Sequence, residues 1–156
     1  MQIRSIIPIL MAATVAGGVI GCSSQSYDGA ERAAVSGTVT LDGEPVPAGT
    51  VYLMPEAGAQ NGRISGATIK DGTFNVRESR GPNLGNYNLS FEMTRPTGKF
   101  RSVDESGVPY DEIFQNLTPK SLARGRSKHT VEIRAGKNVF QFTATSDGEL
   151  SISREK

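Results

Sequence analysis

The chain has 156 residues, with 17 lysines and arginines against 16 aspartates and glutamates, one histidine, one cysteine and 18 glycines. This length fits one domain with a tail. A single cysteine excludes an internal disulfide framework and any multi-cysteine zinc site, and a single histidine leaves little for a histidine-based metal site or catalytic relay. The near-zero net charge gives no general attraction to nucleic acid.

The first 21 residues have the pattern of a secretory signal peptide. Arg4 supplies a positive start, an apolar run extends from Ile6 to Ile20, and a glycine ends it. The run is shorter than the roughly 20 residues that a transmembrane helix needs, and a proline and two glycines weaken it further. The sequence therefore predicts that residues 1–21 direct export and are removed, which would leave equal numbers of basic and acidic side chains.

The only cysteine, Cys22, follows this segment directly. Val19-Ile20-Gly21-Cys22 resembles the lipobox of bacterial lipoproteins, in which the thiol receives a diacylglyceryl group and the chain is cut before the cysteine. The resemblance implies anchoring by fatty acids such as palmitate, since several acyl chains hold a protein stably in a membrane. A free thiol is the alternative, which an oxidising compartment disfavours. In the sorting pattern of such lipoproteins, an aspartate after the cysteine retains the protein in the inner membrane. Ser23 stands at that position, so we expect the protein in the outer membrane, facing the periplasm or the cell surface.

Residues 22–33 are small and polar and show no periodicity. We expect a flexible tether that holds the following domain away from the membrane. A short helical turn around residues 29–34 is the alternative interpretation.

From residue 34 to residue 156 the chain contains short segments in which apolar and polar side chains alternate. This period of two is typical of β-strands with one buried and one solvated face. Seven or eight such strands predict an all-β, antiparallel sandwich in one domain. The residues expected to face the core are Val35, Gly37, Val39, Leu41, Val51, Leu53, Phe74, Val76, Tyr87, Leu89, Phe91, Met93, Val131, Ile133, Phe140, Phe142, Leu150 and Ile152.

Acidic or amide residues followed by glycine separate the alternating segments. These pairs tolerate the positive φ that tight hairpin turns require. The clearest hairpin is predicted over residues 69–74, and residues 135–137 are expected to form a similar joint between two late strands. The pairs are Asp42-Gly43, Asn61-Gly62, Asp71-Gly72 and Asp147-Gly148.

Residues 94–128 depart from the alternation. Residues 94–109 are rich in glycine, proline and charge and predict a long exposed loop, which in a small domain is usually functional or mobile. Residues 110–122 place Tyr110 and Phe114 at helical spacing. We therefore expect one or two helical turns, or an irregular loop, that pack Phe114 against the sandwich.

Three segments resemble the carboxypeptidase regulatory-like domain, whose fold is a transthyretin-like (Ig-like) β-sandwich of about seven strands. They are residues 35–51 (VSGTVTLDGEPVPAGTV), 71–76 (DGTFNV) and 83–89 (NLGNYNL), although the last lacks the proline that this family places before the glycine. Residues 108–110 and 130–142 resemble small planctomycete-type lipoproteins with one such sandwich and no assigned activity. These motifs consist of turn and core residues, so they bear on fold more than on function.

Several of these residues have a structural interpretation of their own. Gly37 and Gly49 are expected where strands approach closely or bend. Pro45 and Pro47 flank a turn and protect a strand edge. Tyr87 is expected to bury its ring and to hydrogen-bond a backbone group through its hydroxyl.

No catalytic pattern is present, and we expect no enzyme activity. His129 is expected to be a surface residue at a strand end, and neither a nucleophile elbow nor a phosphate-binding glycine loop occurs. Transthyretin-like folds include a hydrolase of purine catabolism, but that family uses more than one histidine and a C-terminal Tyr-Arg-Gly-Ser motif, which residues 151–156 (SISREK) do not match.

Two adjacent carboxylate pairs, Asp104-Glu105 and Asp111-Glu112, are expected to be solvated loop charge. Calcium binding together with Asp71 or Asp147 is the alternative, although no EF-hand pattern is present. The sequence therefore predicts neither a metal nor a cofactor.

The densest charge lies in residues 120–128, where four basic side chains occur in nine residues: Lys120, Arg124, Arg126 and Lys128. They could contact anionic lipid headgroups or an acidic glycan, at about 1 kcal/mol for each charge near an anionic surface. An ordinary solvated loop is the alternative. Nucleic acid is disfavoured because no aromatic residues are interleaved.

Together these features predict a lipid-anchored cell-envelope protein with a non-catalytic structural or protein-interaction β-sandwich. The alternative is a carbohydrate- or peptide-binding module that uses the loop over residues 94–128. Candidate partners are the membrane, envelope proteins and glycans, and the sequence leaves the oligomeric state open.

Overall fold

The computed structural model describes residues 29–57 and 62–155. The predicted signal peptide, Cys22, the first part of the predicted tether and Asn61 of one predicted turn lie outside these residues. The described part contains no helix long and apolar enough to cross a membrane.

The described residues are all-β, as predicted, with one short 3-10 helix, η1 (Glu78–Arg80), and no α-helix. The ten strands are β1 (Ala34–Leu41), β2 (Glu44–Pro45), β3 (Ala48–Pro55), β4 (Ser65–Lys70), β5 (Thr73–Val76), β6 (Gly85–Val103), β7 (Pro109–Asn116), β8 (Thr130–Ile133), β9 (Lys137–Ala144) and β10 (Leu150–Arg154).

All strands belong to one mixed sheet in the order β10-β9-β1-β5-β4-β3-β6-β7, with β2 paired to β1 and β8 paired to β6. The prediction of a purely antiparallel sheet was wrong at one place, because β1 and β9 run parallel from Ala34 opposite Lys137 to Leu41 opposite Ala144. Residues 134–136 cause this arrangement: they leave β8, which is paired to β6, and start β9 beside the beginning of β1. They therefore do not form the expected hairpin-like joint.

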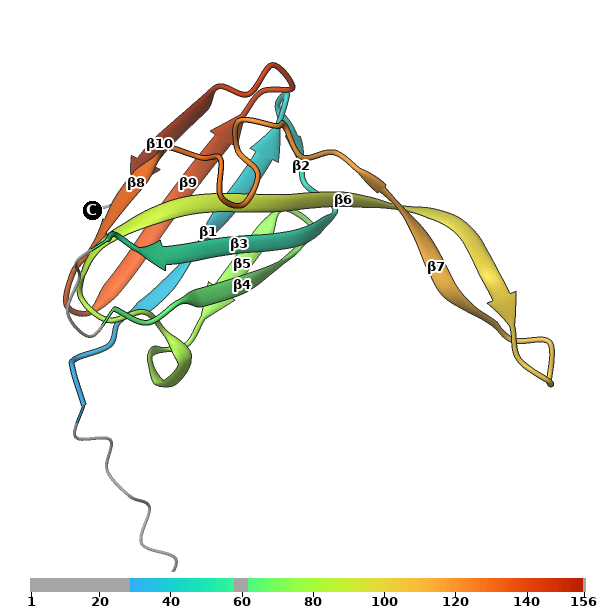
Figure 1. The fold of residues 1–156 in the computed structure, drawn as a ribbon, viewed down its shortest axis with the longest axis horizontal. Helices are drawn as coiled ribbons and strands as arrows, with labels where there is room; N and C mark the ends of the chain where they lie inside the picture. The colour runs from blue at the N-terminus through green and yellow to red at the C-terminus, as the bar shows by residue number, and fades with distance from the viewer. Residues whose placement is uncertain (1–28, 58–61, 156) are drawn as a thin grey trace, which may run out of the picture.

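The sheet folds over so that strands distant in the ladder meet in one core (Figure 1). Phe91 of β6 packs edge-on against Phe142 of β9 with ring centres 5.5 Å apart, although four strands separate β6 from β9 in the sheet. Phe74 of β5 stacks on Phe142 at 5.6 Å. Burying each such side chain contributes about 1.5–3 kcal/mol. Most residues that the alternation assigned to the core are buried, and Leu41, Leu150 and Ile152 are partly buried against it.

The two tightest turns have the predicted chemistry. Asp42 and Gly43 between β1 and β2, and Asp71 and Gly72 between β4 and β5, all have positive φ, between 49° and 86°. Each pair forms a two-residue hairpin loop, in which aspartate and glycine tolerate the left-handed conformation.

Gly37 and Gly49 lie at close backbone approaches, as predicted. A Cβ atom on Gly37 would lie 1.8 Å from the carbonyl oxygen of Phe140, and one on Gly49 would lie 2.0 Å from that of Glu92. Tyr87 is buried as expected, although no hydrogen bond of ordinary geometry forms at its hydroxyl within the described residues. Burial raises the pKa of Tyr87 above its usual value, and the backbone of Arg63 and Asn83 lies close enough to the hydroxyl to lower this pKa in part.

The region expected to be a loop followed by helical turns is a β-hairpin, so both expectations were wrong. β6 pairs with β3 as far as Thr94 and then continues to Val103, paired only with β7. This projecting part of β6 and β7, residues 95–116, is called the arm below (Figure 1). Phe114 is 50% exposed instead of being packed against the core. The arm has no buried face and therefore no apolar alternation that could have revealed it.

The described end of the predicted tether is held against the domain. Ala33 is buried and its N–H donates to the carbonyl oxygen of Pro82 at 3.0 Å. The Asn83 side-chain amide donates to the carbonyl oxygens of Ala30 at 2.8 Å and Glu31 at 3.3 Å. A flexible tether therefore does not extend through residues 30–33.

Candidate binding site

The edge of β6 opposite β3 is completed by three different segments. β8 pairs with its first residues and β7 with its last ones. Residues 117–129, called the basic loop below, fill the gap between them. The N–H groups of Leu89, Phe91 and Met93 donate to His129 O at 2.8 Å, to Leu122 O at 2.9 Å and to Thr118 Oγ1 at 2.8 Å. The basic loop is therefore hydrogen-bonded to β6 at several points along its length.

The base of the basic loop is also packed. The Leu122 side chain is fully buried, and the Leu122 N–H donates to the carbonyl oxygen of Pro119 at 3.0 Å. The Arg126 N–H donates to Ala123 O at 3.0 Å, which closes a second turn. These contacts fix the backbone of the basic loop, whereas its four basic side chains are exposed, as the alternative of a solvated loop expects.

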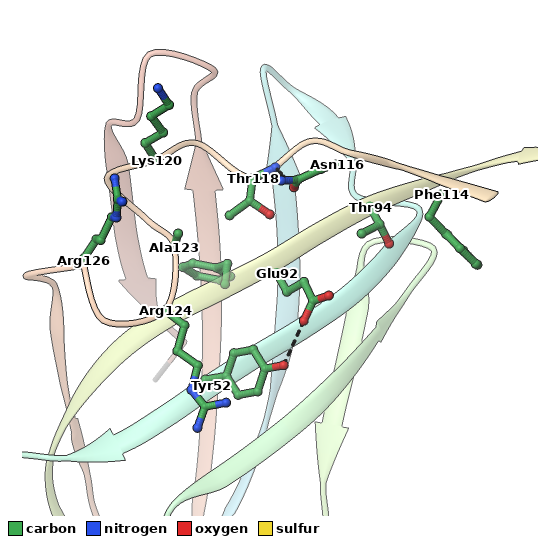
Figure 2. Close-up of a pocket in the computed structure, with 11 residues that line it drawn as sticks. Tyr52, Glu92, Thr94, Phe114, Asn116, Thr118, Lys120, Ala123, Arg124 and Arg126 are labelled. Carbon is green, nitrogen blue, oxygen red and sulfur yellow. Dashed lines mark hydrogen bonds between the residues drawn. The ribbon is translucent and has the colours of Figure 1, made fainter.

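A hollow of about 670 Å³ lies between the basic loop, β3, β6 and the start of the arm (Figure 2). Of the four basic residues singled out in the sequence, Lys120, Arg124 and Arg126 line it, whereas Lys128 does not. Its lining residues are Tyr52, Phe91, Glu92, Thr94, Phe114, Asn116, Thr118, Lys120, Ala123, Arg124 and Arg126.

Tyr52, Glu92 and Arg124 interact within this hollow. The Tyr52 hydroxyl donates to Glu92 Oε2 at 2.9 Å, and the Arg124 guanidinium lies over the Tyr52 ring, 5.2 Å from its centre (Figure 2). The hydrogen bond to Glu92 raises the pKa of Tyr52 above its usual value, because deprotonation would remove the donor, and burial and the negative carboxylate act in the same direction. Tyr52 is therefore a neutral donor that already occupies one oxygen of Glu92.

The hollow carries excess positive charge. Three cations line it against the single carboxylate of Glu92. Within the described residues, neither Lys120, Arg124 nor Arg126 forms a salt bridge, and the ion pair found there joins Arg134 to Glu132 at 2.6 Å. The Arg134 guanidinium, through its hydrogen bond and its charge, lowers the pKa of Glu132. Exposed basic side chains without salt-bridge partners are available to an anion.

Sequence reasoning missed the wall of the hollow that β3, β6 and the start of the arm form. Tyr52 and Glu92 alternate with the core residues of their strands and lie on the opposite face. The signal that could have drawn attention was an aromatic ring, Tyr52, on a face otherwise assigned to solvent. Thr94 and Phe114 join them because β6 runs on into the arm.

The remaining candidates form no catalytic or metal-binding cluster in residues 29–57 and 62–155. No group of three or more histidine, cysteine or acidic side chains there could hold a metal ion. His129 lines a separate, smaller hollow in which Glu149 is the one carboxylate. Asp104 instead accepts the N–H groups of Ser106 at 2.9 Å and Val108 at 2.8 Å, which stabilises the turn at the tip of the arm.

Comparisons with protein-family models, curated proteins and solved structures found no match for this chain. Within the described residues two features are candidates for function: the arm, with its exposed apolar side chains, and the cationic hollow beside it.

Proposed function

We propose that this chain is a lipid-anchored, non-catalytic protein of the bacterial cell envelope whose arm binds another protein. The observation that carries the proposal is the composition of the arm surface. The arm exposes five large apolar side chains, each at least 45% accessible: Phe100, Val103, Val108, Tyr110 and Phe114.

An arm of this kind gains little stability by itself. A two-stranded hairpin in water is marginal without a packed face, and no residue from Arg95 to Val103 is buried. Exposed apolar clusters on soluble domains mark sites of protein contact. A partner that covers the arm would stabilise the hairpin and remove these side chains from water.

The fold class proposed here is a transthyretin-like β-sandwich, as in the carboxypeptidase regulatory-like domain. Its support is the meeting of Phe91 and Phe142 across the core and the pair of tight turns at Asp42 and Asp71. Such a scaffold positions β6 rigidly, so that the arm projects from a fixed base.

The anchor proposed at Cys22 precedes this scaffold. Residues 30–33 contact the domain through Ala33 and Asn83, at the end where β1 begins. Acyl chains on Cys22 would therefore hold that end of the domain toward a membrane, with export directed by residues 1–21.

Replacement of Cys22 by alanine tests the anchor. We expect Cys22→Ala to leave the membrane fraction or to accumulate as the uncleaved precursor, because the thiol is the acylated group, and incorporation of labelled palmitate should be lost. The neighbouring Ser23→Ala is the matched control and should fractionate and label as the wild type does. Membrane fractionation of Cys22→Ala identical to the wild type would show that the proposed anchor is wrong.

Replacement of the two valines at the tip tests the arm. With a photoreactive amino acid at position 110, the full chain should form a discrete cross-linked product with one envelope protein in intact cells. Val103→Ser with Val108→Ser should reduce this product at least about tenfold, since buried interface side chains contribute ~1.4 kcal/mol or more. Ile64→Ser removes an equally exposed side chain outside the arm, 57% accessible, and should have no effect. Equal yields from the two variants would rule the arm out.

The cationic hollow supports a second candidate function, a carbohydrate- or peptide-binding module over residues 94–128. The observation that favours it is the set of three cations without salt-bridge partners at one concave site. The hollow lies at the base of the arm and the valines lie at its tip, and Phe114 is the one exposed apolar residue of the arm that also lines the hollow.

A further inference from the structure

We propose that the hollow binds an acidic glycan, a chain of sugar rings that carry carboxylate groups. The cations of the basic loop pair with the carboxylates, and the exposed aromatic ring of Phe114 packs against the face of a sugar ring. This inference deepens the second candidate function. Only the choice of a glycan over the membrane surface rests on the proposed anchor.

The charges favour a carboxylate ligand. Arg124 and Arg126 carry planar guanidinium groups, whose donors match the two oxygens of a carboxylate, and Lys120 adds a point charge. The one acidic group in the hollow, Glu92, already accepts the Tyr52 hydroxyl. An incoming anion therefore meets a net positive site whose internal carboxylate has a partner.

The neutral groups favour sugar rings over a simple inorganic anion. A sugar ring presents C–H groups on its faces and hydroxyls at its edge, so it needs both an apolar surface and hydrogen-bonding groups. Phe114 and Tyr52 supply rings in the hollow, and Thr94 and Asn116 supply polar groups. Asn116 Oδ1 accepts the Thr118 N–H at 2.9 Å, which orients the side chain and leaves its NH₂ group to donate to a hydroxyl.

The position of the basic loop disfavours the bilayer that would hold Cys22. Ser121 Oγ donates to Gly148 O at 3.0 Å, in the connection between β9 and β10, and the Ser146 N–H in that connection donates to Asp42 Oδ1 at 2.9 Å. The basic loop therefore lies by the end of β1, whereas the chain enters the domain at Ala34. The eight residues of β1 separate these points by about 23 Å. The basic loop thus lies about one strand length from the end of the domain that the proposed anchor would hold toward the membrane.

The test uses the full chain in micelles of a polyoxyethylene detergent, which carries no sugar. Its affinity for polygalacturonate is compared with that for neutral dextran, polyglutamate, inorganic phosphate and glycerophosphoglycerol, the water-soluble headgroup of phosphatidylglycerol. We expect binding to polygalacturonate that weakens with added salt, and binding at least about tenfold weaker to each of the other four probes.

Two variants connect this binding to the hollow. The triple variant Lys120→Gln, Arg124→Gln and Arg126→Gln should lose at least about tenfold in affinity for polygalacturonate, and Phe114→Ala about threefold. The matched control, Lys70→Gln with Arg77→Gln and Lys137→Gln, removes the same charge from exposed positions outside the hollow and the basic loop and should bind as the wild type does.

Equal losses in the two triple variants would overturn the proposal, because they would show attraction by overall charge. Equal affinity for polyglutamate would assign the hollow to acidic peptides, and preference for glycerophosphoglycerol would assign it to lipid headgroups. Phosphate bound as tightly as the polymer would indicate a simple anion site. None of these results depends on acylation of Cys22 or on the valines of the arm, so failure of this inference is distinguishable from failure of the proposed function.

Discussion

Replacement of Gly37 by alanine is expected to destabilise the protein strongly. Gly37 lies in β1 opposite Phe140 of β9, and a Cβ atom there would lie 1.8 Å from the Phe140 carbonyl oxygen and 2.7 Å from its carbonyl carbon. These are backbone atoms held in the β1–β9 ladder, so no side-chain rotation can relieve the overlap. The Gly37 φ of 157° adds strain for any L-amino acid with a side chain.

The size of this destabilisation depends on which part of the structure must move to make room for the alanine methyl group. Inserting volume into a packed core costs about 1–3 kcal/mol when the structure can adjust. Here the adjustment would separate two backbones in the middle of an eight-residue parallel pairing. We therefore expect Gly37→Ala to cost at least about 4 kcal/mol, a large part of the about 5–15 kcal/mol by which a domain is normally stable.

Gly85→Ala is the matched control for this prediction. Gly85 also has a positive φ, 130°, but a Cβ atom there would meet nothing within 4 Å. Denaturant unfolding should therefore show about 1–3 kcal/mol of backbone strain for Gly85→Ala and at least about 2 kcal/mol more for Gly37→Ala. Equal losses in the two variants would mean that the close approach to Phe140 is not what requires glycine.

The strands were predictable where burial imposes a period of two. Phe140 and Phe142, for example, alternate with Gln141 because one face of β9 points into the core. The pairing of strands was not predictable in the same way. Gly37 and Phe140 are adjacent only because the residues after β8 carry the chain back to the start of β1, and no local pattern specifies that route.

The arm was missed for a related physical reason. Its strands are held by hydrogen bonds to each other and by no buried face, so the apolar period that marks the other strands is absent. Its prolines and glycines suggested a loop, yet Pro96 and Gly98 lie where the register between β6 and β7 shifts, and Gly107 forms the tip. Helical spacing of Tyr110 and Phe114 was a coincidence within a strand.

The candidate site was half predictable. The basic residues stood out by charge density, and three of the four line the hollow. Tyr52 and Glu92 could not be joined to them from sequence, because their proximity depends on the register of β3 against β6, in which Tyr52 lies opposite Ser90 and Thr50 opposite Glu92. A charge pattern thus identified the loop but not the surface that it covers.

The link between β8 and β9 depends on one buried side chain, Asn138, which sequence reasoning did not single out. Asn138 is 1% exposed, and its amide donates to the carbonyl oxygens of Arg134 at 2.8 Å, Ala34 at 3.3 Å and Gly136 at 3.3 Å. Its Oδ1 accepts the Arg134 N–H at 3.0 Å and Arg154 Nη1 at 3.2 Å. This side chain therefore connects the link between β8 and β9, residues 134–136, to β1 and to β10.

Asn138→Ala is expected to destabilise the protein by about 3 kcal/mol. The variant removes the partners of backbone groups at a buried position, and each buried group left without a partner costs about 1–3 kcal/mol, reduced where water can enter. Asn75→Ala provides the control, because Asn75 is exposed on β5. This variant should lose no more than about 0.5 kcal/mol of its free energy of unfolding. Denaturant unfolding measures both values. Residues 134–136 start the parallel β1–β9 pairing, so hydrogen exchange in Asn138→Ala should increase first in β9 and β10. A loss of stability no larger than that of Asn75→Ala would show that β8 and β9 hold this link without the Asn138 side chain.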